Sequence, residues 1–281
     1  MSKTMNINKY IKALRPRFCF LQFGLFFYFA KLVEVNSSML WLQCFLISVP
    51  FCFFYGLNDI FDYESDKLNP RKTQSEFGGV VLDPKMNKNI VIGTVVSAIA
   101  MILTSFLTFN PLNIFITFLM IFCFTFYSVP PLRFKDKPII DFVSSTIIYY
   151  SIAIIPLTYS GLNIQEIFTK TIFLIPTLIS WHLYGELMDL DSDKKAKMNT
   201  TAVFFGYKVT SFIILISALT KLLFFSSQNP IVQFTSILFL LSFVYLVIQK
   251  SQKKYEIFAR IGVDISIILF LVFILSKTIN I

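Results

Sequence analysis

Apolar segments long enough to cross a lipid bilayer recur along this chain, and short polar connections separate them. A membrane-spanning helix needs about 20 predominantly apolar residues, so the pattern predicts an all-α polytopic membrane protein with about nine transmembrane helices. The expected spans are 18–33, 39–60, 89–109, 111–128, 139–161, 167–188, 209–226, 230–248 and 260–277.

The basic residues support this count, because they gather in every second connection. Of the 25 Lys and Arg residues, 21 lie before the first span or in the second, fourth, sixth and eighth connections. An excess of Lys and Arg marks the cytoplasmic side of a membrane protein. The N-terminus and the long polar loop 67–88 are therefore expected in the cytoplasm. The net charge of +9 follows from this topology, and no nucleic-acid partner is expected.

Composition agrees with an integral membrane protein. The chain is 56% hydrophobic and 15% charged, with 34 Phe, outside the range of soluble domains. The four cysteines are scattered through apolar runs without C-x-x-C spacing, so we expect buried thiols rather than disulfides or metal ligands. They are Cys19, Cys44, Cys52 and Cys123.

Two acidic clusters, each at the end of an apolar segment, carry the candidate chemistry. In the first, Asp59, Asp62 and Asp66 stand at i, i+3 and i+7, which is one face if the helix continues through them. In the second, Asp189 and Asp193 stand at i and i+4. Both clusters are expected on the cytoplasmic side. Their Glu64 and Asp191 point away from the shared faces and are expected to face solvent.

Carboxylates placed on one face repel one another, and beside lipid they require a positive partner. Mg²⁺ prefers carboxylate oxygens and commonly completes its shell with water and substrate phosphates. The five aspartates are therefore candidate Mg²⁺ ligands and catalytic residues.

Basic residues beside these clusters are typical of an anion site with more than one phosphate, since Arg offers bidentate contacts and Lys a point charge. The candidate diphosphate-binding residues are Asn58, Arg71, Lys72, Arg133, Lys135 and Lys194. The only histidine, His182, sits one turn before Glu186 and is interpreted as structural. Several tyrosines could present ring faces to a carbocation: Tyr55, Tyr149, Tyr150 and Tyr184.

These residues resemble the UbiA-type intramembrane prenyltransferases. Asn58, Asp59, Asp62 and Asp66 match that family's N-D-x-x-D-x-x-x-D motif, and Asp189 with Asp193 matches its D-x-x-x-D motif. Leu14-Arg15-Pro16 and Tyr-Ser-x-Pro-Pro-Leu at 127–132 also recur there. The resemblance implies a single domain over 1–281, a barrel-like bundle around a central cavity, and two Mg²⁺ ions that bridge the motifs and a prenyl diphosphate. One departure is the run 197–199, where many members have Gly and then a basic residue.

Within the family, the stretches 58–62 with 69–72 and 131–135 ahead of Asp141 look most like the lycopene elongase branch. Such enzymes add a C5 prenyl group to the ends of a carotenoid, often with hydration. The expected partners are a prenyl diphosphate, a lipophilic acceptor and membrane lipids, and nothing in the sequence indicates an obligate protein partner.

The expected reaction is prenyl transfer. The cations neutralise charge on the leaving diphosphate, C–O cleavage leaves an allylic cation, and an electron-rich acceptor attacks it in a cavity that excludes water. A quinone precursor, a porphyrin or another lipid remains an alternative acceptor. A cation transporter is a more distant alternative, because transporter sites usually lie near the midplane on broken helices.

Overall fold

The computed structural model describes residues 7–35, 37–73, 80–83 and 88–225, with isolated positions between 237 and 248. Those residues form helices and connections and no strand, which confirms the all-α class. The predicted spans 260–277 and, apart from those isolated positions, 230–248 lie outside the described residues, as do 74–79 and 84–87 of the polar loop. The chain divides into two compact units, Met1–Phe134 with Ile147–Ile167, and Lys135–Thr146 with Phe168–Ile281.

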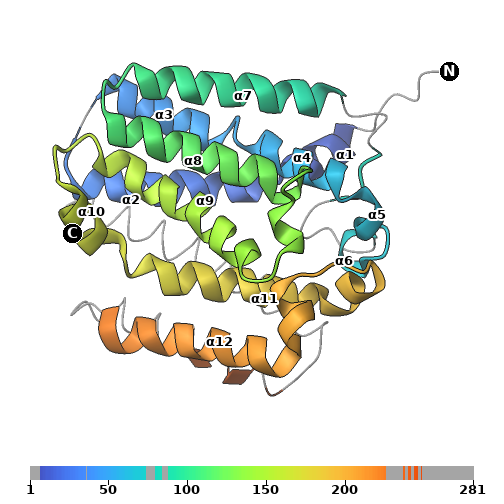
Figure 1. The fold of residues 1–281 in the computed structure, drawn as a ribbon. Helices are drawn as coiled ribbons and strands as arrows, with labels where there is room; N and C mark the ends of the chain where they lie inside the picture. Colours follow the sequence, from blue (N-terminus) through green and yellow to red (C-terminus); the bar gives the residue numbers. More distant parts are fainter. Residues whose placement is uncertain are drawn as a thin grey trace. The chain divides into compact units, whose positions relative to one another are not determined.

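The first unit contains the helices that lead up to and follow the first acidic motif (Figure 1). They are α1 (Ile7–Leu14), α2 (Pro16–Leu32), α3 (Ser38–Ser48), α4 (Cys52–Phe61), α5 (Tyr63–Asp66), α6 (Pro70–Thr73), α7 (Lys88–Phe106), α8 (Pro111–Ser128) and most of α9 (Ile140–Leu157). Helix α4 packs against α1, α7 and α8, so the end of α4 is held on several sides.

The predicted span 39–60 is interrupted between α3 and α4, at Pro50. Proline has no backbone N–H to donate to the carbonyl four residues earlier, and the Leu46 carbonyl accepts instead from the Phe51 N–H at 3.2 Å. Helix α7 adds side-chain bonds at the break: Ser97 Oγ donates to the Pro50 carbonyl at 3.1 Å, and Thr94 Oγ1 donates to the Phe53 carbonyl at 3.1 Å. These bonds attach α7 to the start of α4.

The core of this unit is aromatic around α4 and α8. The ring centroids of Phe51 and Phe54 lie 4.8 Å and 5.3 Å from that of Phe124, and all three side chains are buried. Buried aromatic pairs add specific contact energy beyond their area. This packing fixes the position of α4 ahead of the acidic motif.

The expectation for the cysteines was wrong for one pair. Cys19 of α2 and Cys52 of α4 form a disulfide, with their Cα atoms 6.5 Å apart. The pairing depends on how α2 and α4 approach each other, which a sequence separation of 33 residues does not reveal. Cys44 and Cys123 are buried free thiols, as predicted.

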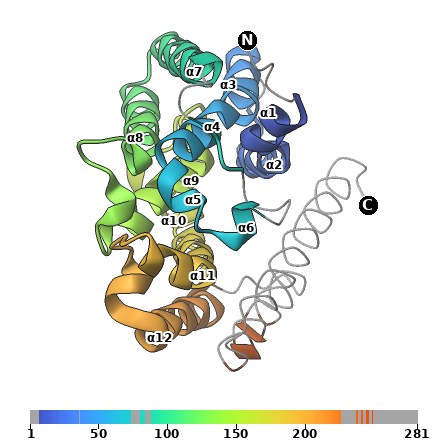
Figure 2. The same cartoon turned by 90° about the vertical axis from the view of Figure 1, so that its right-hand side faces the viewer.

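The second unit is built on α11 (Leu174–Lys195) and α12 (Thr201–Phe225), which lie side by side (Figures 1 and 2). Gly206 bends α12 near its start, with φ 74° and ψ 171°, a conformation that L side chains rarely adopt. The 3₁₀ helix η2 (Phe134–Asp136) and α10 (Ile164–Thr171) occur where the chain passes between the units.

Five helical segments of the described chain are long and apolar enough to cross a membrane: Ser38–Phe61, Lys88–Phe106, Pro111–Ser128, Ile140–Leu157 and Thr201–Leu223. Large apolar side chains on α7 remain exposed, among them Ile92 and Val96 at 59% and Leu103 at 58%. Such a surface suits lipid and not water. The protein is an integral membrane protein.

Candidate active site

The three aspartates of the first motif are buried on one side of the end of α4. Asp59 is 0%, Asp62 6% and Asp66 5% exposed. The condition for the shared face, a helix that continues through the motif, is not fully met, because Asp62 is a turn residue between α4 and α5. The helical phase nevertheless survives: the N–H groups of Asp62 and Asp66 bond to carbonyls four residues back, at 2.9 and 2.8 Å. Glu64 is exposed, as the phase predicts.

Cationic side chains lie between these carboxylates. Lys72 Nζ is 2.8 Å from both Asp59 Oδ1 and Asp66 Oδ2. The Arg15 guanidinium donates to Asp59 Oδ1. Arg133 lies 3.6 Å from Asp62 and donates to the Phe61 carbonyl at 3.3 Å. The first motif is therefore a compact set of charges from α4, α5, α6 and the connections before α2 and after α8.

The pKa values show how strongly this cluster depends on positive charge. Burial raises the pKa of Asp66 to about 6; Lys72 opposes the shift and Asp59 adds to it. Burial by itself lowers the pKa of Lys72, but Asp59 and Asp66 outweigh burial, so that this pKa is raised. Near neutral pH, which is above its pKa of about 6, Asp66 is ionised and Lys72 is charged, so the two side chains form an ion pair.

Neutral hydrogen-bonding groups complete this site. Ser128 Oγ donates to Asp62 Oδ2 at 3.2 Å, and the Val80 N–H in the polar loop lies 3.3 Å from Asp59 Oδ2. The side-chain oxygen of buried Asn58 has no hydrogen-bond partner among the residues that the structure describes. A buried acceptor of this kind is expensive unless a ligand meets it.

The second motif lies on α11, which continues unbroken through it to Lys195, as predicted. Asp189 and Asp193 are partly exposed, whereas the Asp191 side chain is exposed. His182, Glu186, Asp189 and Asp193 are spaced at i, i+4, i+7 and i+11, which is one helix face.

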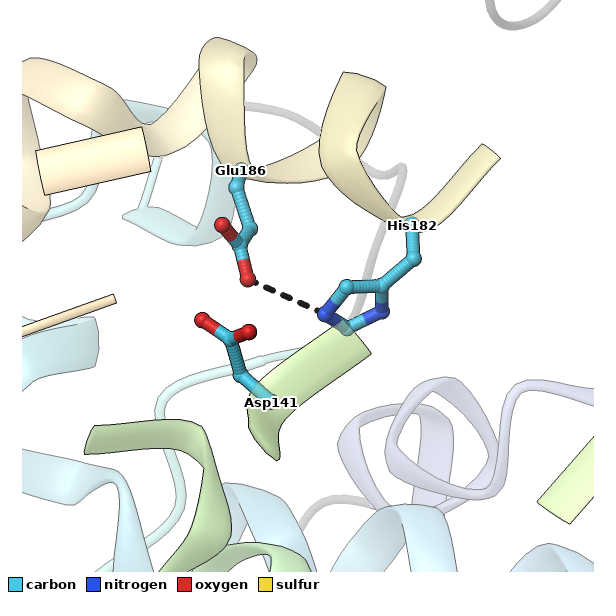
Figure 3. A group of neighbouring side chains, drawn as sticks. All are labelled: Asp141, His182 and Glu186. Atoms are coloured by element: carbon cyan, nitrogen blue, oxygen red, sulfur yellow. Dashed lines mark hydrogen bonds and ion pairs between the residues drawn. The ribbon is translucent and has the colours of Figure 1, made fainter. Parts of the chain in front are cut away.

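Deeper along that face, Glu186 and His182 meet Asp141 from the start of α9 (Figure 3). The ligand-type atoms of the three residues all lie within 4.8 Å of one another. His182 Nε2 is 3.0 Å from Glu186 Oε1. These residue types could hold a metal ion.

The carboxylates of this cluster already have partners at the start of α12. The Ala202 N–H donates to Glu186 Oε2 at 2.9 Å, and both the N–H and the hydroxyl of Thr201 donate to Asp141. The first N–H groups of a helix have no partner within it and carry partial positive charge. Asp141 and Glu186 therefore serve as the cap of α12, and His182 satisfies the other oxygen of Glu186.

A sequence model of the UbiA prenyltransferase family matches residues 20–271 of this chain. The chain belongs to the UbiA prenyltransferase family. The two aspartate motifs fall within the matched region.

Among its relatives are proteins named lycopene elongase/hydratase. One from Corynebacterium glutamicum is 29% identical over 171 residues, or 60% of this chain and 58% of that protein. One from Haloarcula japonica is 28% identical over 157 residues, covering 55% of this chain and 50% of that protein. This UbiA prenyltransferase thus spans little more than half the length of the relatives it matches.

Solved structures support the fold. A UbiA homologue from Archaeoglobus fulgidus, bound to DMAPP and Mg²⁺, has a TM-score of 0.62 at 16% identity and covers 92% of this chain and 99% of its own. A digeranylgeranylglyceryl phosphate synthase has a TM-score of 0.61 at 16% identity, covering 95% of this chain and 97% of its own. The fold of this UbiA prenyltransferase is therefore that of these membrane enzymes.

The first unit of this UbiA prenyltransferase brings together five of the residues singled out from its sequence: Asp59, Asp62, Asp66, Lys72 and Arg133. Arg71 lies in α6, next to Lys72, with its side chain outside the described part.

In the second unit, Lys135 is buried in η2, at 6% exposure, whereas Lys194 is exposed at the end of α11. Neither position tests the expected contact with a diphosphate, which stays a prediction for both lysines.

Sequence reasoning missed Arg15 and Ser128 as partners of the aspartates. Both lie in stretches that carry the family resemblance, Leu14-Arg15-Pro16 and Tyr127-Ser128. That resemblance was the available signal. In the sequence, Arg15 is one of several basic residues that precede the first span, and its contact with Asp59 in the structure distinguishes it from the others.

Proposed function

We propose that this enzyme transfers a prenyl group from an allylic prenyl diphosphate to a lipophilic acceptor within the membrane, with Mg²⁺, and releases diphosphate. The best candidate for the acceptor is a carotenoid such as lycopene. One observation carries the proposal: three buried aspartates beside Lys72, Arg15 and Arg133 form a site built for a multivalent ion and its counter-charge.

The donor atoms of the first motif fit Mg²⁺. Carboxylate and amide oxygens are the ligands that hard divalent cations prefer, and the buried Asn58 oxygen has no partner within the described protein. The proposed metal ligands are Asp59, Asp62, Asp66, Asp189 and Asp193. Bound Mg²⁺, in two ions, supplies positive charge that stabilises the leaving diphosphate.

The protein's own residues have two further proposed roles, to bind the diphosphate and to exclude water. The proposed diphosphate-binding residues are Asn58, Arg71, Lys72, Arg133, Lys135 and Lys194. Arginine is suited to this because its planar fork meets two phosphate oxygens at once. The apolar walls around α4 and α8 exclude bulk water, which would otherwise capture the allylic cation.

The carotenoid assignment is supported by relatives that are named lycopene elongase/hydratase. The stretch Pro131 to Lys135 also favours it. Asp141, which accompanies that stretch, bonds to Thr201 at the start of α12. Asp141 therefore supports the fold, and the choice of acceptor depends on the cavity walls instead.

Membranes that contain the enzyme should transfer radiolabel from dimethylallyl diphosphate to lycopene. Membranes with Asp62→Ala should not, whereas Glu64→Ala provides a matched control in which an exposed carboxylate of the same motif is removed. Transfer of radiolabel to an aromatic acid but not to lycopene would support the proposed prenyl-transfer activity and would contradict the proposed carotenoid acceptor. A singly extended intermediate is expected before the doubly extended product, because each end of lycopene is prenylated in a separate event.

The proposed topology places the N-terminus and both aspartate motifs in the cytoplasm. In a background without native cysteines, Glu64→Cys and Asp191→Cys should react with a membrane-impermeant thiol reagent from the cytoplasmic side. Ile164→Cys, which is 70% exposed in the wild type, should react from the outside. Labelling of residues 64 and 191 from opposite sides would separate the motifs by a hydrocarbon core of about 30 Å and would reject the shared diphosphate.

A further inference from the structure

Three polar side chains from three helices of the first unit form a hydrogen-bonded chain within its apolar core. Gln22 of α2 donates from Nε2 to Tyr55 Oη of α4 at 2.9 Å. Tyr55 Oη lies 3.0 Å from Tyr149 Oη of α9. Gln22 is 2% and Tyr55 3% exposed. We call these three residues the Gln22–Tyr55–Tyr149 triad.

The triad has an unused hydrogen-bonding atom. The side-chain oxygen of Gln22 is buried and has no partner within the described protein. Rotating the amide by 180° would only exchange the unpartnered oxygen for an unpartnered nitrogen. Native proteins seldom leave such an atom without a ligand, because its desolvation is not compensated. A small polar molecule is the natural partner for it.

The triad is also close to the first-motif aspartates that are proposed to bind Mg²⁺. Tyr55 precedes Asp59 by one turn of α4. Arg15 connects the two, because its guanidinium carbon lies 5.3 Å from the centre of the Tyr55 ring while the same group donates to Asp59. The allylic cation would form at this level, where aromatic ring faces attract positive charge.

The other neighbours of Tyr55 are apolar. The ring centroids of Phe18 and Phe124 lie 5.4 Å and 5.2 Å from that of Tyr55. The triad is therefore a polar position within aromatic walls. Such a position can hold one water molecule while the surrounding rings exclude others.

We propose that the Gln22–Tyr55–Tyr149 triad holds the water molecule that captures the carbocation left on the acceptor after prenyl transfer, so that the product is a tertiary alcohol. This inference rests on the proposed function. A water molecule that donates its hydrogens to Gln22 Oε1 and to a tyrosine oxygen keeps its lone pairs for the cation.

The bonds and electrons of this reaction balance. The allylic C–O bond breaks, and diphosphate leaves with the electron pair. The terminal double bond of an acyclic polyene then forms the new C–C bond and leaves a tertiary cation. A lone pair of the held water forms the C–O bond, and the released proton passes to the diphosphate. Without that water, the cation loses a proton instead, and the product is an alkene.

The triad is tested by the ratio of two products. Membranes from lycopene-producing cells are incubated with dimethylallyl diphosphate in ¹⁸O-labelled water, and prenylated products are separated and weighed by mass spectrometry. The wild type should yield prenylated alcohol that carries ¹⁸O. Gln22→Met should lower the alcohol-to-alkene ratio about tenfold, as the loss of one hydrogen bond to the water predicts, while total prenylated product is retained.

A second variant and a matched control make this test decisive. Tyr149→Phe removes a hydroxyl of the triad instead of the Gln22 amide and should shift the alcohol-to-alkene ratio in the same direction. Gln43→Met removes another buried glutamine of the same unit, whose amide bonds to Asn113 and Tyr159. A purely structural effect would lower total product in all three variants, whereas the ratio should change only in the triad variants.

Each other outcome has a separate meaning. If the wild type forms prenylated lycopene only as alkene, or if the ratio is unchanged in both triad variants, the water site is rejected and the prenyltransferase proposal stands. If the wild type forms no prenylated lycopene at all, the carotenoid acceptor is rejected, and the water site is rejected with it.

Discussion

The two acidic motifs of this enzyme have similar sequences but are neutralised in different ways. In the first, buried aspartates face the charged side chains of Lys72, Arg15 and Arg133. On the helix of the second, the buried carboxylate is Glu186, and it meets the first N–H groups of α12 together with Asp141. The buried carboxylates of the first motif are therefore neutralised by cationic side chains. The buried carboxylates near the second motif are stabilised by the N-terminal end of α12.

This difference distinguishes carboxylates that can bind a ligand from carboxylates that support the fold. A carboxylate satisfied by backbone N–H groups supports a helix and is not readily available to a ligand. Carboxylates held by lysine and arginine can exchange those partners for a metal ion or a diphosphate complex. Asp189 and Asp193 lie partly exposed at the end of the same α11 face.

The largest effect is expected at the proposed metal ligands. Asp62→Ala and Asp189→Ala should each abolish prenyl transfer while the protein still inserts into membranes, because a highly charged site then lacks a ligand. Glu64→Ala and Asp191→Ala, on the exposed sides of the same motifs, should have little effect. Retention of more than about a tenth of the activity, a loss below about 1.4 kcal/mol in activation free energy, would contradict the ligand assignment.

Removal of divalent cations should have a similarly large effect. Turnover in membranes is expected to stop after treatment with EDTA and to return when Mg²⁺ or Mn²⁺ is added, because diphosphate departure requires concentrated positive charge. Full activity after exhaustive chelation would mean that Lys72, Arg15 and Arg133 neutralise the site unaided.

A smaller loss is expected at Arg15. Arg15→Gln leaves Asp59 with one cation fewer, and kcat/KM should fall roughly 30-fold, a value typical of truncating one partner of a buried charge pair. Arg15→Lys should recover part of that loss. Lys12→Gln, at an exposed position of α1, provides the control for the general effect of removing an N-terminal charge. Equal losses in Arg15→Gln and Lys12→Gln would reduce Arg15 to a topological anchor.

The smallest effect on activity is expected at Asp141. Asp141→Ala leaves the N–H and hydroxyl of Thr201 without their partner and should lower the free energy of unfolding by about 1–3 kcal/mol. Activity per folded molecule should change little. Thermal unfolding in detergent, with Asp191→Ala as the control, measures the first quantity. A stable but inactive Asp141→Ala protein would place this cluster within the reaction instead of the fold.

Much of the architecture could be predicted from local pattern. The apolar segments indicated membrane helices, since length and hydropathy are properties of a single segment. The phase of Asp59, Asp62, Glu64 and Asp66 predicted which carboxylates would be buried, and this holds despite the turn at Asp62. The break at Pro50 was harder to predict, because the hydroxyl groups that bond to the Pro50 and Phe53 carbonyls there come from a different helix, α7.

The sequence by itself indicated the family and the membrane topology, through the resemblance of an N-D-x-x-D-x-x-x-D motif and a D-x-x-x-D motif and through the alternating basic connections. Only the tertiary structure decided which partners those residues have. Arg15 lies 44 residues from Asp59 in the chain, Asp141 lies 60 from Thr201, and the Cys19–Cys52 disulfide and the Gln22–Tyr55–Tyr149 triad join helices far apart in sequence. Spacing along a helix specifies a face, whereas the approach of two helices depends on the packing of every side chain between them.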